Sequence, residues 1–139
     1  MEWRKLTISL ADRLLLDTHA FIWAANDLDK LSNAARSAIE DEGNQIFVSA
    51  VSAIEITIKF RVGKLPEADE LSARFEAIIA EFGFAELPVS VTQARVAGLL
   101  SFEHRDPFDR MLIAQAQIEQ MTLVSNEKLF DQFGVIRLW

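Results

Sequence analysis

The chain has 139 residues, no cysteine and a formal net charge of −7. This length suits one domain. The lack of cysteine excludes disulfides and thiolate zinc sites and indicates a reducing cytoplasm. The negative charge argues against sequence-specific DNA binding by this chain alone. Half of the residues are hydrophobic, but no apolar run is long enough for a membrane helix, and charges lie where a signal peptide would have its apolar core.

Short apolar runs alternate with helical patterns along the chain. Residues 13–17 (RLLLD) predict a strand that is buried on both faces, because the apolar residues do not alternate with polar ones. Helical spacing then predicts a helix over 31–39, and Gly43-Asn44 separates it from a second strand at 45–48. The remaining expected elements are helices at 50–62 and 71–82, a strand at 85–89, a helix at 92–100, a turn at 103–107, a helix at 107–120, a strand at 121–125, a short helix at 127–133 and a strand at 135–138.

This order predicts an α/β domain in which helices cover a five-stranded, mostly parallel sheet. Residues 1–12 precede the first strand as an N-terminal extension to a single domain that spans 1–139. Ligands of such sheets bind beyond the carboxyl ends of the strands. Candidate functional residues are therefore sought where strands end and the following helices begin.

Carboxylates recur at these positions. Asp17 ends the first strand, Glu55 lies one helical turn into the helix after the second strand, Asp106 and Asp109 open a later helix, and Glu127 follows the fourth strand. If the five carboxylates converge, they repel one another and need divalent cations to neutralise them. Oxygen ligands alone favour Mg²⁺ or Mn²⁺.

Each acid also has a structural explanation. Asp17 can cap the next helix, and Asp106-Pro107 followed by Asp109 fits an N-cap, a first-turn proline and a first-turn acid. Glu127 can complement a helix dipole. Glu55 is the exception, because it is surrounded by apolar residues in FVSAVSAIEITI, although Lys59 offers it an ion-pair partner four residues later.

Basic residues near these acids are candidate phosphate contacts. They are Lys59, Arg61, Arg105 and Arg110. The usual explanation of scattered lysines and arginines on helices is a solvated face. Thr18, next to Asp17, is a further candidate for substrate binding or for the start of a helix. The two histidines are too far apart in the chain to suggest a histidine metal site, and no phosphate-binding loop or nucleophile motif is present.

Four segments together resemble the PIN-domain nucleases, and in particular the VapC-like toxins of type II VapBC toxin–antitoxin modules. They are LLLDTHAFIWA, VSAVSAIEITIKFRVGKL, HRDPFDRMLIAQA and TLVSNEKLFDQFGVIRLW. The resemblance runs from Leu14 to Trp139. It implies a three-layer α/β/α PIN domain in which three or four acids hold Mg²⁺ or Mn²⁺ for RNA hydrolysis.

The resemblance assigns roles to individual residues. It implies that Asp17, Glu55 and Asp109 are the central catalytic and metal-binding acids, and that Asp106 is an added ligand or an outer acid. The fourth acid of the family usually stands in a T-x-D motif, whereas this chain reads Ser125-Asn126-Glu127. Glu127 is therefore the expected catalytic equivalent, and Asn126 is its competitor.

The resemblance further implies a cytoplasmic ribonuclease that acts on RNA, with transfer RNA as its expected substrate. It also implies a homodimer and a VapB-like antitoxin whose tail covers the acidic groove. The alternative is a non-catalytic module of the same fold that binds RNA or a partner. A receiver domain would need an acidic pair after the first strand, and a haloacid dehalogenase would need D-x-D where this chain reads Asp17-Thr18-His19.

Overall fold

A computed structural model describes residues 12–101 and 106–139. Within them, five strands form one sheet in the order β3-β2-β1-β4-β5, and every neighbouring pair is parallel. The strands are β1 Arg13–Leu16, β2 Gln45–Ser49, β3 Ala85–Leu87, β4 Thr122–Val124 and β5 Arg137–Leu138. The predicted five-stranded sheet is confirmed, and it is fully parallel.

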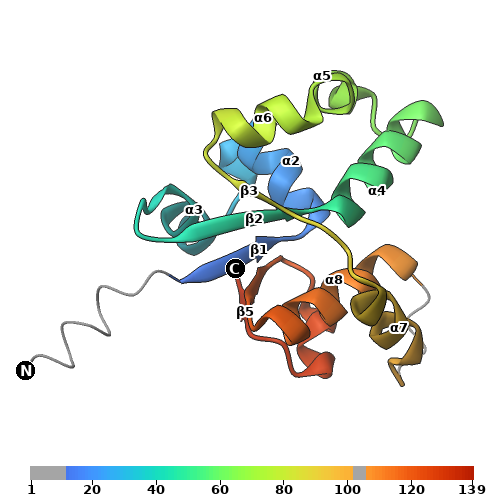
Figure 1. The fold of residues 1–139 in the computed structure, drawn as a ribbon. Coiled ribbons are helices and arrows are strands. Elements are labelled where there is room, and N and C mark those ends of the chain that lie inside the picture. The colour runs from blue at the N-terminus through green and yellow to red at the C-terminus, as the bar shows by residue number, and fades with distance from the viewer. Residues whose placement is uncertain (1–11, 102–105) are drawn as a thin grey trace, which may run out of the picture.

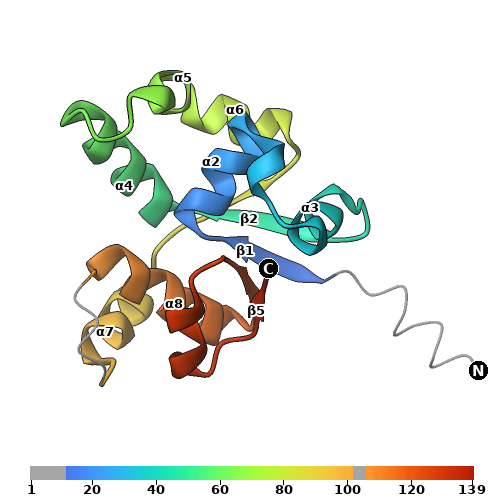
Figure 2. The same ribbon diagram turned by 180° about the vertical axis from the view of Figure 1, so that it is seen from behind.

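Helices cover both faces of this sheet. The α-helices are α2 Thr18–Asn26, α3 Asn33–Glu40, α4 Ala50–Arg61, α5 Asp69–Ala73, α6 Phe75–Glu81, α7 Val91–Leu99 and α8 Pro107–Glu119. The 3₁₀ helices are η1 Leu28–Lys30, η2 Pro66–Ala68 and η3 Lys128–Phe133. Helices α2, α3, α5 and α6 lie on one side of the strands and α7 and α8 on the other (Figures 1 and 2).

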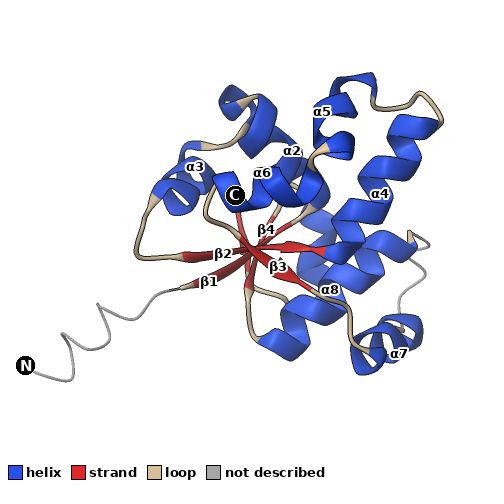
Figure 3. Ribbon diagram, turned by 45° about the horizontal axis from the view of Figure 1, so that its top comes forward, coloured by secondary structure: helices blue, strands red, loops and turns tan. Residues whose placement is uncertain are grey.

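The apolar β1 strand explains the three layers. Leu14 and Leu16 contact the core under α2 and α6, whereas Leu15 contacts a second core with α8 and η3. A strand buried on both faces needs apolar residues at successive positions. The consecutive leucines of β1 therefore place it at the centre of the sheet, with β2 and β4 beside it (Figure 3).

One helix differs from its prediction. The expected helix over 71–82 is two helices, α5 and α6, separated at Arg74, where φ is −127° and ψ is 35°. The guanidinium of Arg74 bridges the carboxylates of Glu70 and Glu81, at 2.9 and 2.6 Å. Phe82, at the end of the predicted helix, is the residue after α6 and has 45% of its surface exposed. Helical spacing alone did not reveal this break.

Two regions of the sequence prediction fall partly outside the described residues. These are the N-terminal extension, of which only Asp12 is described, and the turn at 103–107, which includes Arg105. In the described part of the chain, no helix combines the length and apolarity that a membrane crossing requires.

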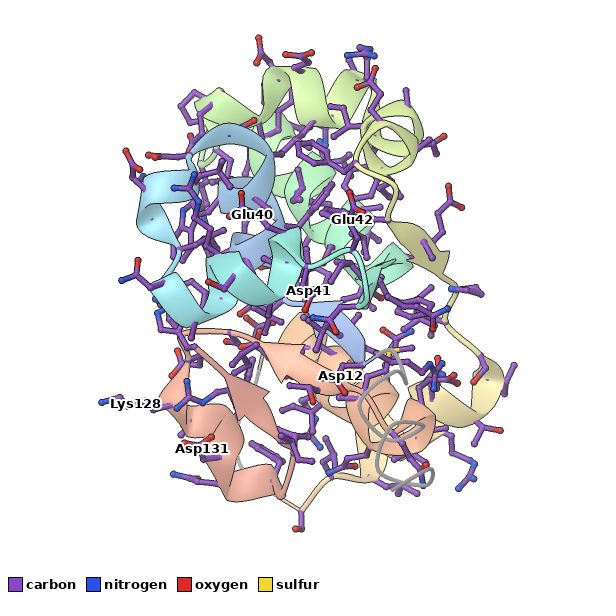
Figure 4. The ribbon with its side chains drawn as sticks, turned by 90° about the vertical axis from the view of Figure 1, so that its left-hand side faces the viewer. Asp12, Glu40, Asp41, Glu42, Lys128 and Asp131 are labelled. Carbon is purple, nitrogen blue, oxygen red and sulfur yellow. The ribbon has the colours of Figure 1, made fainter. Side chains whose placement is uncertain are left out.

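Acidic residues also gather far from the carboxyl ends of the strands. Glu40, Asp41 and Glu42 lie at the end of α3 and in the turn before β2, and Asp12 lies just before β1 (Figure 4). The carbonyl of Asp12 accepts a hydrogen bond from the amide of Gln45, which brings the two segments together. The net negative charge of the chain is therefore only partly located at the candidate site.

Candidate active site

Asp17 stands where β1 ends and α2 begins. Its backbone amide donates to the carbonyl of Val124 on β4 at 3.0 Å, and its Oδ1 accepts from the amide of Ala20 at 2.8 Å. The residue is an N-cap, as the structural explanation expected. The cap uses one carboxylate oxygen, so it fixes the side chain without excluding a second role.

Burial raises the pKa of Asp17, because only 8% of the residue is exposed and desolvation disfavours the charged form. Hydrogen bonds from Ser125 and from the Ala20 amide, and the nearby His19, lower the pKa, whereas Glu55 raises it. The net shift is upward. The charged form of Asp17 is therefore disfavoured by burial, and a bound cation would stabilise it.

This shift predicts a pH dependence of stability in the presence of EDTA. The contribution of Asp17 to the free energy of unfolding is fully present below the unfolded-state pKa and is lost as pH rises through the higher folded-state pKa. We expect Asp17→Asn, measured by urea denaturation, to gain stability relative to wild type as pH rises above about 4, the pKa of an unperturbed aspartate. A stability difference that is independent of pH would contradict the assignment.

Glu55 lies in the second turn of α4 with only 4% of its surface exposed. Both of its oxygens have partners: the hydroxyl of Thr18 donates to Oε1 at 2.6 Å, and the ammonium of Lys59 donates to Oε2 at 2.5 Å. The hydroxyls of Thr18 and Ser52 are 3.0 Å apart. This network holds a buried carboxylate in one position, next to α2.

The other three acids lie at helix starts. Asp106 caps α8, where its Oδ1 accepts from the amides of Phe108 and Asp109 at 2.9 and 3.3 Å. Asp109 lies in the first turn of the same helix. Glu127 precedes η3, where its Oε1 accepts from the amide of Leu129 at 3.2 Å. Each local explanation therefore describes a real contact.

The five acids nevertheless line one pocket of about 230 Å³. Its lining residues are Asp17, Thr18, His19, Glu55, Lys59, Asp106, Asp109, Asn126, Glu127 and Phe130. The pocket lies beyond the carboxyl ends of β1 and β4, the two adjacent strands at the centre of the sheet. The topology brings together acids that are up to 110 positions apart in the chain (127 − 17).

The chemistry of the lining suits a hard divalent cation. Carboxylates and the Asn126 amide supply oxygen donors, and Lys59 is the single lysine or arginine among the described lining residues. Within residues 12–101 and 106–139, however, no three acidic or histidine side chains are close enough to hold one ion together. The donors thus share a pocket without surrounding one point. The carboxylates of Asp17, Glu55, Asp106 and Glu127 accept hydrogen bonds from groups within the protein.

The candidate phosphate-binding residues have different positions. Lys59 lines the pocket, whereas Arg61 is exposed at the last turn of α4 and does not line it. The Arg110 guanidinium donates to the carbonyls of Ala97 and Leu100, at 3.0 and 2.5 Å, and so binds the end of α7. Arg105 is outside the described residues.

Three polar residues at the site had no assigned role in the sequence interpretation. His19 lines the pocket, and buried Ser125 accepts from the Glu127 amide at 2.9 Å while it also hydrogen-bonds to Asp17. Ser52 contacts Thr18. Asn126 and Glu127 both line the pocket, so both remain candidates for the fourth position. Their position shortly after a buried strand was the sequence signal that could have marked these polar residues as part of the site.

Buried carboxylates of this kind can bind a cation and act on a phosphate ester. Comparison with known proteins identifies the family of this fold. The family model for the PIN domain matches residues 14–136. No significant match was found among curated proteins.

Several solved structures share the fold. VapBC2 from Rickettsia felis, bound to a promoter DNA fragment, aligns with a TM-score of 0.67 and 18% identity over 90% of this chain and 96% of that one. The Mycobacterium tuberculosis toxin VapC20, which cleaves the sarcin–ricin loop, aligns with a TM-score of 0.65 and 15% identity over 88% and 96%. FitAcB from Neisseria gonorrhoeae aligns with a TM-score of 0.60 and 20% identity over 89% and 95%.

The family match covers nearly the whole described chain, and the solved structures share its topology at low sequence identity. Both findings agree with the three-layer arrangement. The chain belongs to the PIN-domain family.

Proposed function

We propose that this protein is a metal-dependent endoribonuclease and the toxin of a VapBC-like toxin–antitoxin module. The observation that carries the proposal is the convergence of five carboxylates on one pocket of a PIN domain. Repulsion among them favours cation binding, and phosphodiester hydrolysis is a reaction that such cations promote. Structural similarity to toxins of toxin–antitoxin pairs supports the biological role.

Asp17, Glu55 and Asp109 are the proposed ligands for Mg²⁺ or Mn²⁺, with Asp106 as an added ligand or outer acid. When bound, a divalent cation activates water for in-line attack on phosphorus and stabilises negative charge on phosphate oxygens. The protein holds the proposed ligands in place: the Ala20 amide donates a hydrogen bond to the Asp17 carboxylate, and the Thr18 hydroxyl donates one to the Glu55 carboxylate. Glu127 or Asn126 would complete the acidic rim.

Lys59 is expected to compete with the cation for Glu55, because its ammonium holds Oε2 of that carboxylate. Lys59→Met should therefore tighten Mn²⁺ binding about three- to tenfold, which corresponds to up to about 1.4 kcal/mol. Isothermal titration of the purified protein measures this. Lys64→Met is the matched control, because Lys64 is exposed and lies just beyond α4. Equal affinities for all three proteins would contradict competition.

The proposed substrate is RNA, with transfer RNA as the first substrate to test. A recessed pocket admits a splayed single strand or loop more easily than a stacked duplex. The similarity to a toxin that cleaves the sarcin–ricin loop also favours RNA as the substrate class. A ribonuclease that acts on cellular RNA would work in the cytoplasm, which is the proposed location of this protein.

A VapB-like antitoxin and a second copy of this chain are the proposed partners. The solved structures of similar fold include toxin–antitoxin complexes. The acidic pocket would favour a basic segment of the antitoxin as its cover. Ile54 and Ile58 on α4 and Val62 directly after it are exposed at intervals of four residues, and they form an apolar stripe available for protein contact.

The test is cleavage of total small RNA by the purified full chain with Mg²⁺ or Mn²⁺ and, in parallel, with EDTA. We expect discrete fragments with metal and none with EDTA, and the fragment ends would identify the target. If a folded, antitoxin-free protein binds RNA without cutting it under any condition, the non-catalytic binding module is the correct function. If cutting persists in EDTA, metal-dependent chemistry is refuted.

A further inference from the structure

An aromatic row lies beside the acidic pocket, formed by His19, Trp23 and Trp139. His19 and Trp23 are one turn apart on α2, with ring centroids 5.5 Å apart and planes tilted by 45°. The rings of Trp23 and Trp139 have centroids 5.8 Å apart and an angle of 55°. The three rings therefore form one continuous series.

The row begins at the pocket. His19 is a lining residue, two positions after Asp17. At the other end, Trp139 follows Leu138, whose carbonyl accepts from the amide of Ser125 at 3.1 Å. Ser125 directly precedes Asn126 and Glu127, which line the pocket. The row thus runs from α2 to the strand beside the loop that carries the acidic rim.

Packing of the hydrophobic core explains only part of this row. Trp23 and Trp139 contact the core beneath α2, but both remain half-buried rather than enclosed. His19 is exposed. On the same helix, Phe21 is fully buried and contacts Phe75. Helix α2 therefore has a core face and, separately, an aromatic face that solvent reaches.

The negative charge of the pocket indicates which part of an RNA ligand the aromatic row would bind. Five carboxylates line the pocket, and among its described lining residues Lys59 alone is a lysine or arginine. Contacts with phosphate therefore provide little attraction for RNA on their own. Stacking on aromatic rings does not depend on charge and contributes about 1 to 3 kcal/mol per base. Only unpaired bases have faces available for it.

We propose that the aromatic row is the subsite that binds unpaired bases of the RNA next to the cleaved bond. This inference rests on the proposed ribonuclease function and narrows its substrate class to RNA with unpaired nucleotides at the cleavage site. Bases stack along His19, Trp23 and Trp139, and the adjoining backbone enters the acidic pocket.

The experiment measures both RNA binding and cleavage by the full chain. Binding of a labelled, mixed-sequence 12-nucleotide RNA is compared with that of its abasic counterpart and of a 12-base-pair duplex, by fluorescence anisotropy in EDTA. His19→Ala and Trp139→Leu are the test variants, His19→Phe and Trp139→Phe restore a ring, and Phe82→Ala is the control at an exposed aromatic residue on another surface. Circular dichroism confirms that each variant is folded.

We expect the two test variants to weaken binding of the unpaired RNA at least fivefold, from the loss of about one stacked base. Binding of the abasic RNA should not change, the phenylalanine variants should recover affinity, and cleavage should show a raised KM with little change in kcat. Wild-type affinity for the unpaired RNA in both test variants would overturn the proposal. So would an equal loss of affinity for the abasic RNA.

The result also separates this inference from the proposed function. If the wild-type protein cuts RNA with Mn²⁺ but the test variants behave as wild type, only the stacking subsite is refuted. If the wild-type protein neither binds nor cuts RNA, the proposed function and the subsite fail together.

Discussion

Asp17→Asn is expected to reduce metal-dependent RNA cleavage by about two orders of magnitude or more, because it removes a charged ligand from the centre of the proposed metal site. The substitution should leave the fold intact. Asparagine caps helices as well as aspartate does, and its side-chain oxygen can accept the same bond from the Ala20 amide. The measurement is the initial cleavage rate at saturating Mn²⁺, together with Mn²⁺ affinity by titration calorimetry.

The matched control is Asp29→Asn, which makes the same chemical change at a side chain that is 96% exposed. It should retain wild-type cleavage and Mn²⁺ binding. If Asp17→Asn cleaves as fast as wild type, Asp17 is not a metal ligand, and its burial at the end of β1 serves only to cap α2. If cleavage falls while Mn²⁺ affinity is unchanged, Asp17 acts on the substrate instead.

Phe21→Ala is expected to lower the free energy of unfolding by about 3 to 5 kcal/mol, because it removes a large, fully buried ring and leaves a cavity. Phe21 contacts the rings of Phe75 and Phe84, with centroids 5.2 and 6.4 Å away. These contacts hold α2 against α6 and the start of β3. Since α2 also begins at the candidate site, its docking supports the positions of Asp17, Thr18 and His19.

Urea denaturation at neutral pH measures the effect on unfolding. Phe82→Ala is the control: its ring stacks on Phe84 but is 45% exposed, so the loss should be about 1 kcal/mol or less. Equal losses for both variants would mean that the core beneath α2 contributes no more than a surface contact. In that case the site would depend on other anchors, such as the bond between the Asp17 amide and Val124.

Much of the fold follows from local sequence patterns. The consecutive leucines of β1 predicted a strand buried on both faces, and the polar residues before α2 and α8 predicted helix starts that the structure has. Such signals act over a few residues, and they hold because backbone hydrogen bonding and burial are local requirements. The break at Arg74 could not be predicted, because an apolar spacing of three and four residues continues across it. The ion pairs that accompany the break join Arg74 to Glu70, four positions away, and to Glu81, seven positions away.

The sequence by itself determined that Asp17, Glu55 and Glu127 lie at one edge of the sheet, because they follow parallel strands that end there. Asp106 and Asp109 follow no strand directly, and the packing of α8 brings them to the same pocket. Only the tertiary structure decided what those side chains contact. Glu55 is bound by Thr18 from another helix as well as by Lys59, and Arg110 turns to the carbonyls that end α7. The direction of a long side chain depends on the partners that packing brings within reach, and those partners are distant in the chain.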